Sequence, residues 1–208
     1  GIHVPRFWQD NGFGNIRPRS GKYVAGITVY GCTNGKPHCR EYLAIRLNEN
    51  LIPGQTYQVE FYVQPLKRSY NVNHIGALFL MNEVEPSAAN SIVAIPQINT
   101  EQILSPTSSS AWLKISGTFI ADEPYPIMIL GNFYSDPNTQ YEKTAMTKNP
   151  FAYYYIDDVS VKKIPPFLKA AVPEDDLSKK DLNKDRLLVL KDIYFDFDSY
   201  ELHPRSFI

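Results

Sequence analysis

Seven segments of the chain consist largely of β-forming residues, and several of them alternate apolar and polar positions. The clearest is TYQVEFYV at 56–63, where every second residue from Tyr57 to Val63 is apolar. Because successive side chains of a strand point to opposite faces, this pattern predicts a strand with one buried face. The predicted strands cover 23–30, 41–47, 56–63, 75–81, 112–120, 127–133 and 153–163.

Turn-forming residues separate these segments, as Pro53-Gly54 does directly before the strand at 56–63. Tyrosine is the commonest aromatic residue, with 14 copies, and it favours strands over helices. Seven such strands predict an all-β protein built as an antiparallel β-sandwich.

Two connections, 83–110 and 135–150, have few periodic apolar residues and are rich in Asn, Ser, Thr and Pro. Loops of this length are often functional. The strand pattern ends at Pro165-Pro166, and a mixed-charge stretch follows before apolar periodicity returns near residue 188. We therefore predict a β-sandwich domain at 1–163, a linker at 164–187 and the start of a second domain at 188–208.

Charge and motifs exclude several function classes. The formal net charge is -1, which argues against a nucleic-acid-binding surface. No stretch approaches the roughly 20 apolar residues of a membrane-spanning helix. The four histidines, His3, His38, His74 and His203, are scattered without metal-site spacing, and no acid–base or nucleophile constellation is recognisable. We therefore predict that the chain is not an enzyme.

Cys32 and Cys39 are the two cysteines of the chain and enclose a short polar loop, which favours a disulfide bond. Two alternatives remain at this point. One is a pair of free thiols, and the other is a zinc site that includes His38, although structural zinc usually takes four ligands. A disulfide would place the domain in an oxidising compartment, outside the cytoplasm.

The segment YYYIDDVSV at 153–161 contains two adjacent carboxylates in a predicted strand. If Val159 and Val161 face the core, Asp157 shares their face and Asp158 points away. A buried carboxylate needs a cation or several hydrogen-bond donors. Asp157 is therefore either a ligand of a structural calcium ion or an acceptor of hydrogen bonds from backbone amides or arginine.

Sugar binding by a β-sandwich needs exposed aromatic rings, because a sugar presents apolar C–H faces ringed by hydroxyl groups. An aromatic residue in a strand is more often part of the core, so each candidate has this second interpretation. The candidates are Tyr30, Tyr62, Tyr70, Trp112, Phe133, Tyr134 and Tyr141.

Five segments together resemble the galactose-binding-like jelly roll of carbohydrate-binding modules: PRSGKYVAGI at 18–27, LIPGQTYQVEFYV at 51–63, WLKISGTFIA at 112–121, ILGNFY at 129–134 and YYYIDDVSV at 153–161. The resemblance implies a jelly-roll β-sandwich. It also implies that Ser20, Gly21 and Asp157 flank a structural calcium.

A second resemblance lies at 190–206, where LKDIYFDFDSYELHPRS looks like the first strand of the α/β peptidoglycan-binding domain of the OmpA family. The domain would be truncated here, with its peptidoglycan-contacting residues beyond Ile208. The two-part arrangement resembles OmpA-family outer-membrane proteins of Bacteroidota. It implies a location in the cell envelope, at the outer membrane.

Together these observations lead to two hypotheses. The first is a non-catalytic envelope scaffold, whose β-sandwich docks outer-membrane protein partners in a larger complex while the OmpA-like domain anchors it to peptidoglycan. The alternative is a carbohydrate-binding module for an envelope or external glycan. An exposed cluster of Tyr62, Trp112 and Tyr134 would favour the alternative.

Overall fold

The computed structural model of the chain describes residues 13–14, 16–32, 39–84, 91–106, 108 and 111–165. Within this part of the chain it has nine strands and one short 3₁₀ helix, η1 (Asp136–Asn138). The strands are β1 (Ala25–Tyr30), β2 (Leu43–Arg46), β3 (Thr56–Pro65), β4 (Asn71–Val72), β5 (Ile75–Leu80), β6 (Leu113–Ile120), β7 (Ile127–Asn132), β8 (Tyr141–Glu142) and β9 (Ala152–Lys163).

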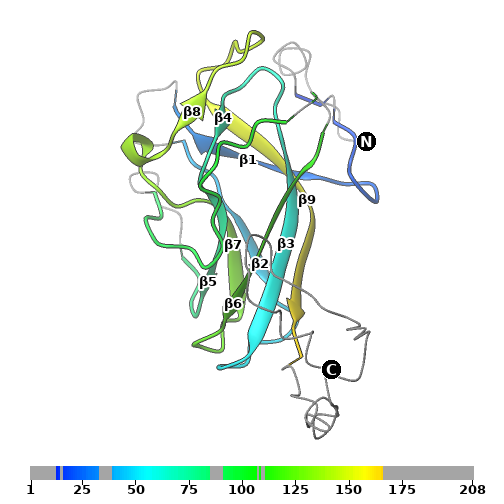
Figure 1. The fold of residues 1–208 in the computed structure, drawn as a ribbon, viewed down its shortest axis with the longest axis vertical. Coiled ribbons are helices and arrows are strands. Elements are labelled where there is room, and N and C mark those ends of the chain that lie inside the picture. Colours follow the sequence, from blue (N-terminus) through cyan, green and yellow to red (C-terminus); the bar gives the residue numbers. More distant parts are fainter. Residues whose placement is uncertain are drawn as a thin grey trace, which may run out of the picture. The chain divides into compact units, whose positions relative to one another are not determined.

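The strands form two antiparallel sheets and a small ribbon (Figure 1). The first sheet has the order β1-β9-β3-β6, and the second has the order β2-β7-β5. The ribbon consists of β4 and β8 and lies at one end of the sandwich. This arrangement confirms the predicted all-β, antiparallel jelly-roll sandwich.

All seven predicted strands are present, with ends that differ by one or two residues from the prediction. β4 and β8 were not predicted, because each has two residues and neither shows any alternation. β8 and η1 both lie inside 135–150, a connection for which the sequence predicted no strand or helix.

The main core lies between the two sheets. Tyr154 of β9 is fully buried there, and its hydroxyl accepts a hydrogen bond from the Val72 N–H at 3.0 Å and donates one to the Leu104 carbonyl at 3.2 Å. Burial raises the pKa of the Tyr154 phenol far above its ordinary value. Other core residues from the two sheets are Val59, Phe61, Val63, Ala77, Phe79 and Leu130.

A second, smaller core covers the outer face of the β2-β7-β5 sheet. Phe133 is fully buried in it and stacks on Tyr42, with 5.7 Å between the ring centroids. The segment 92–94 covers this face, with Ile92 and Ala94 packed against the second core and Val93 exposed. Of the two interpretations that the sequence left open for Phe133, the core interpretation is therefore confirmed and the sugar-binding one is excluded.

The outer edge of β5 is satisfied by hydrogen bonds from 97–100. The Thr100 hydroxyl bonds both the N–H and the C=O of Ile75, and the Ile98 backbone pairs with Ala77 at 2.9 and 3.2 Å. The Gln97 amide accepts from the Phe79 N–H at 2.8 Å and lies 3.5 Å from its carbonyl. Three different groups thus close an edge that would otherwise be open to pairing with another chain.

This close covering requires a glycine in β5. A Cβ atom at Gly76 would lie 2.2 Å from the Ile98 carbonyl oxygen, so no larger residue fits beneath the covering segment. The identity of residue 76 and the position of 97–100 therefore depend on each other.

Cys32 and Cys39 form a disulfide bond, which confirms the prediction and removes the free-thiol and zinc alternatives. The next residue, Arg40, has a buried side chain that forms an ion pair with Asp136 of η1 at 2.5 Å. The disulfide loop is thereby joined to the connection between β7 and β8.

The compact unit that contains the sandwich ends at Ile164. The predicted linker lies almost wholly, and the OmpA-like segment wholly, outside the described residues, so these domain boundaries stay predictions. Within the described part of the chain, no helix is long and apolar enough to cross a membrane.

We predict that Gln97→Ala destabilises the domain by about 1–3 kcal/mol, because it leaves the buried Phe79 N–H without its acceptor. Thermal or urea unfolding measures the change. Gln58→Ala is the matched control, since Gln58 is an exposed glutamine of β3. Equal stabilities of the two variants would contradict the edge-closing role of Gln97.

Candidate functional site

β9 contains a β-bulge where it pairs with β3. Tyr62 pairs with Asp157 and Glu60 pairs with Ser160, so one more residue of β9 than of β3 lies between the two pairs. Asp158 adopts a φ of +49° at this point. A bulge inserts one residue into the alternation and reverses the faces beyond it.

The bulge makes the predicted orientation of Asp157 wrong. Counting back from Val159 places Asp157 on the core face, but the residue that faces the core here is its neighbour Ile156, which is 2% exposed. Asp157 therefore lies on the outer face of the sheet, where it is partly exposed. Period-two counting fails because an inserted residue leaves no mark in the hydrophobic pattern.

Both carboxylates contact the segment that precedes β1. The backbone N–H groups of Arg19 and Ser20 donate to Asp157 Oδ2 at 2.8 and 3.4 Å. The Ser20 hydroxyl donates to Asp158, and the Arg19 guanidinium forms an ion pair with the same carboxylate. The hydrogen bonds from Ser20 and then from Arg19 hold the pKa of Asp158 below its ordinary value.

These contacts do not fit a calcium site. Calcium takes six to eight oxygen ligands, whereas the groups directed at Asp157 are N–H donors of Arg19, Ser20 and Asp158. The positive charge beside Asp158 is the guanidinium of Arg19. Gly21, with a φ of +60°, forms the turn that follows these donors. Asp157 thus takes the second of its two expected roles, as an acceptor of hydrogen bonds from backbone amides, with Arg19 pairing its neighbour Asp158. A structural calcium stays a prediction.

Tyr62 lies beside this cluster on the outer face of the β1-β9-β3-β6 sheet. The Arg19 guanidinium lies over its ring, 3.5 Å from the centroid, which is a cation–π contact. The Tyr62 hydroxyl donates to Glu60 at 3.2 Å, and Glu60 in turn pairs with Lys114. One face of the Tyr62 ring is therefore occupied by this chain's own arginine.

Trp112 directly precedes β6 and is partly buried. Its neighbour Leu113 packs on the core and pairs with Val63, so Trp112 belongs to the same outer face as Tyr62. Tyr134 follows β7 in the other sheet and stacks on His74, with ring centroids 4.0 Å apart. The predicted trio of Tyr62, Trp112 and Tyr134 is thus divided between two sheets and does not form one exposed cluster.

The structure instead brings together three other candidates, Tyr30, Tyr70 and Tyr141, which we call the tyrosine cluster. Tyr141 stacks on Tyr30 at 5.3 Å and on Tyr70 at 4.8 Å between ring centroids. The ring centroids of Tyr30 and Tyr70 lie 6.3 Å apart. If Tyr141 lay between them, this distance would be close to the sum of its distances to the two rings, which is much larger. Tyr141 is therefore not sandwiched between the two rings but lies across both of them.

The exposure of the three rings follows from this arrangement. Tyr30 and Tyr70 are partly buried and pack against the main core, whereas Tyr141 is 45% exposed. Burial, together with the negative charge of Asp136, raises the pKa of the Tyr30 phenol, so its hydroxyl stays protonated at neutral pH. The cluster thus presents one aromatic face to solvent at the end of the sandwich.

Chain topology creates the tyrosine cluster. Val72 of β4 pairs with Tyr141 of β8, which places Tyr70 and Tyr141 together, and Tyr30 ends β1 where it pairs with Ala152. The three residues are 40 and 71 positions apart along the sequence. Sequence reasoning listed each of them as an aromatic candidate but had no signal that joined them.

A metal site is the other kind of functional site that the sequence raised. Within the described residues, no group of three or more His, Cys, Asp or Glu side chains is placed to hold a metal ion. His74 stacks on Tyr134, and its Nδ1 lies 3.1 Å from the side-chain amide of Asn99. The tyrosine cluster, in which the exposed Tyr141 ring is stacked on two others, is the strongest candidate for a binding surface.

No protein-family model matches the chain, and no curated protein sequence matches it. Solved structures that are similar to it include a CBM4 structure, with a TM-score of 0.33 and 14% identity over 67% of this chain and 94% of that one. Another is the C-terminal domain of EclA, a sugar-binding protein, with a TM-score of 0.34 and 15% identity over 78% of this chain and 99% of that one.

A third similar structure contains the CBM22-1 and GH10 modules of the Clostridium thermocellum endo-1,4-β-D-xylanase 10B, complexed with xylohexaose. Its TM-score is 0.30, with 13% identity over 73% of this chain and 27% of that one. At this level of similarity, the function of the chain has to be inferred from its own surface.

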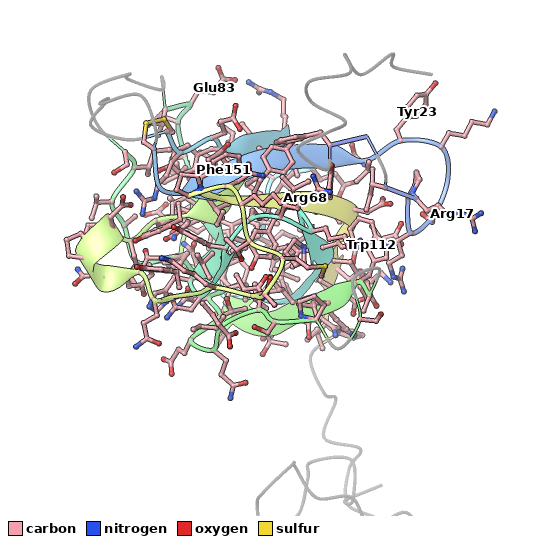
Figure 2. All side chains as sticks on the ribbon, turned by 90° about the horizontal axis from the view of Figure 1, so that it is seen from above. Arg17, Tyr23, Arg68, Glu83, Trp112 and Phe151 are labelled. Carbon is pink, nitrogen blue, oxygen red and sulfur yellow. A yellow bond between two sulfur atoms is a disulfide. The ribbon has the colours of Figure 1, made fainter. Side chains whose placement is uncertain are left out.

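We predict that EDTA or added calcium leaves the melting temperature of the protein unchanged, because Arg19 provides the positive charge beside Asp158. Arg19→Gln is expected to lower the melting temperature, and Arg17→Gln, an exposed control in the same segment (Figure 2), is expected to leave it unchanged. A calcium-dependent melting temperature of the unmodified protein would overturn this account and restore the predicted metal.

Proposed function

We propose that this chain is a non-catalytic glycan-binding module that holds a sugar ring on the exposed face of Tyr141. The observation that carries the proposal is the tyrosine cluster, in which Tyr30 and Tyr70 support Tyr141 from below. A sugar ring stacks its C–H groups on such a face, and removing both surfaces from water stabilises the contact.

The support beneath Tyr141 matters for affinity. A ring that is already held by two neighbours loses little conformational freedom when it binds, and ordering a mobile side chain would cost about 0.5–1.5 kcal/mol. Tyr30 and Tyr70 pack on the core, so the position of Tyr141 is tied to the sandwich itself. The cluster is thus a preorganised contact surface.

The envelope-scaffold hypothesis remains a prediction. Its peptidoglycan anchor lies outside the described residues, and no observation on the sandwich identifies a protein partner or a compartment. Glycan binding does not conflict with such a role, because a binding domain on a linker can act beside an anchoring domain.

We predict that Tyr141→Ala weakens binding to a recognised soluble polysaccharide by about tenfold or more, the effect expected for loss of one aromatic contact of about 1.5–3 kcal/mol. Affinity gel electrophoresis against a panel of neutral and acidic polysaccharides, followed by calorimetry, measures this. Tyr141→Phe keeps the ring and should bind nearly as well as the unmodified protein.

Tyr23→Ala is the control for this experiment. Tyr23 is 82% exposed. It lies on a loop separate from the one that carries Arg68, which is two residues before Tyr70 of the cluster, as Figure 2 shows. Melting curves of all variants confirm that they are folded. If the panel contains no ligand, or if Tyr141→Ala and Tyr23→Ala bind alike, the proposal is wrong.

A further inference from the structure

Two loops meet beside the tyrosine cluster and form one surface. The Arg68 carbonyl accepts hydrogen bonds from the N–H groups of Lys148 and Asn149 at 3.0 and 2.9 Å. The Thr147 hydroxyl lies 3.5 Å from the Ser69 carbonyl, to which it donates. The segments 66–70 and 142–150 are therefore held together, with Tyr70 in the first and Tyr141 directly before the second.

This surface carries a concentration of positive charge. Residues 66–70 and 142–150 together contain four cationic side chains and one carboxylate, although the whole chain has a formal net charge of -1. Three of the cations are exposed and Arg68 is partly buried. The cationic residues are Lys67, Arg68, Lys143 and Lys148.

The nearby carboxylates do not cancel this charge at the tyrosine cluster. Glu142 accepts a hydrogen bond from the Ser105 hydroxyl at 2.6 Å, and as the neighbour of Tyr141 in β8 it points to the opposite face of the ribbon. Asp136, near Tyr30, forms its ion pair with Arg40. Among the described contacts, the charge that lies over the Tyr141 ring is that of Lys143.

Lys143 places one of these charges directly at the cluster. Its ammonium lies 5.6 Å from the Tyr70 centroid and 6.0 Å from the Tyr141 centroid, so it stands over both rings. An exposed lysine has three donors and pairs readily with a carboxylate. Because the Lys143 side chain is exposed, its ammonium can turn from the rings toward a carboxylate of a sugar stacked on Tyr141.

We infer that the glycan bound by this surface is acidic, a polysaccharide whose rings carry carboxylate groups. This inference rests on the proposed function, because Tyr141 binds the sugar face and Lys143 pairs with the carboxylate. The exposed Lys67 and Lys148 attract further carboxylates along the same chain, and a repeating anionic polymer suits a surface with spaced cations.

The experiment compares polygalacturonate with the same polymer after reduction of its carboxyl groups, by calorimetry or affinity electrophoresis. The unmodified protein is expected to bind the acidic polymer about tenfold more tightly at low salt, and this preference is expected to shrink as salt is raised. Lys143→Gln is expected to weaken binding of the acidic polymer by up to about fivefold, as for one exposed ion pair, and to leave the reduced polymer unaffected.

Lys22→Gln is the matched control, because Lys22 is an exposed lysine in the segment before β1. Polyglutamate tests for binding of any polyanion, and equal affinity for polyglutamate and polygalacturonate would overturn the inference. Equal affinity for the two polysaccharides, with Tyr141→Ala weakening both, would overturn the acidic preference and leave glycan binding intact. If neither polymer nor any other glycan binds, both the inference and the proposed function fail.

Discussion

The pairing of β9 with two neighbours at once is the constraint on which the rest of the structure depends. β9 is hydrogen-bonded to β1 on one side and to β3 on the other, so it joins β1 to the rest of the first sheet. Its core-facing residues, including Tyr154 and Ile156, are almost fully buried. The pairing fixes the register of β1, β3 and β9 relative to one another. The loops that begin or end at these strands are therefore restricted to few positions.

The two surfaces discussed above follow from this register. Near the middle of β9, the bulge at Asp157 and Asp158 turns two carboxylates toward Arg19 and Ser20, and Arg19 also covers Tyr62. At the start of β9, Ala152 pairs with Tyr30, which brings the end of β1 to the ribbon that carries Tyr141. The ring of Tyr62 is covered near the middle of β9, whereas the ring of Tyr141 is partly exposed near its start. The guanidinium of Arg19 lies only 3.5 Å from the Tyr62 centroid, whereas, among the described residues, the nearest cation to Tyr141, the Lys143 ammonium, lies 6.0 Å from its centroid.

The edge of β5 illustrates how loops without regular structure can be well determined. Segment 97–100 uses a side-chain amide, a backbone pair and a hydroxyl to satisfy three successive positions of the strand edge. Unsatisfied backbone groups are costly when buried, so the loop is held by the same requirement that holds a sheet. The same reasoning applies to 142–150, whose backbone N–H groups bond the Arg68 carbonyl. The basic surface beside the tyrosine cluster exists because of those bonds.

The amino-acid sequence by itself determined the fold class and the seven long strands, and it favoured the disulfide. Alternation with a period of two is a local property, and two cysteines seven residues apart allow only a short loop between them. The tertiary structure decided the site. Tyr30, Tyr70 and Tyr141 meet through the register of β1 with β9 and of β4 with β8, and the bulge in β9 reverses the face of Asp157. Long-range pairing and a single inserted residue leave no trace in a local pattern, which is why the candidate residues could be listed from the sequence but not assembled.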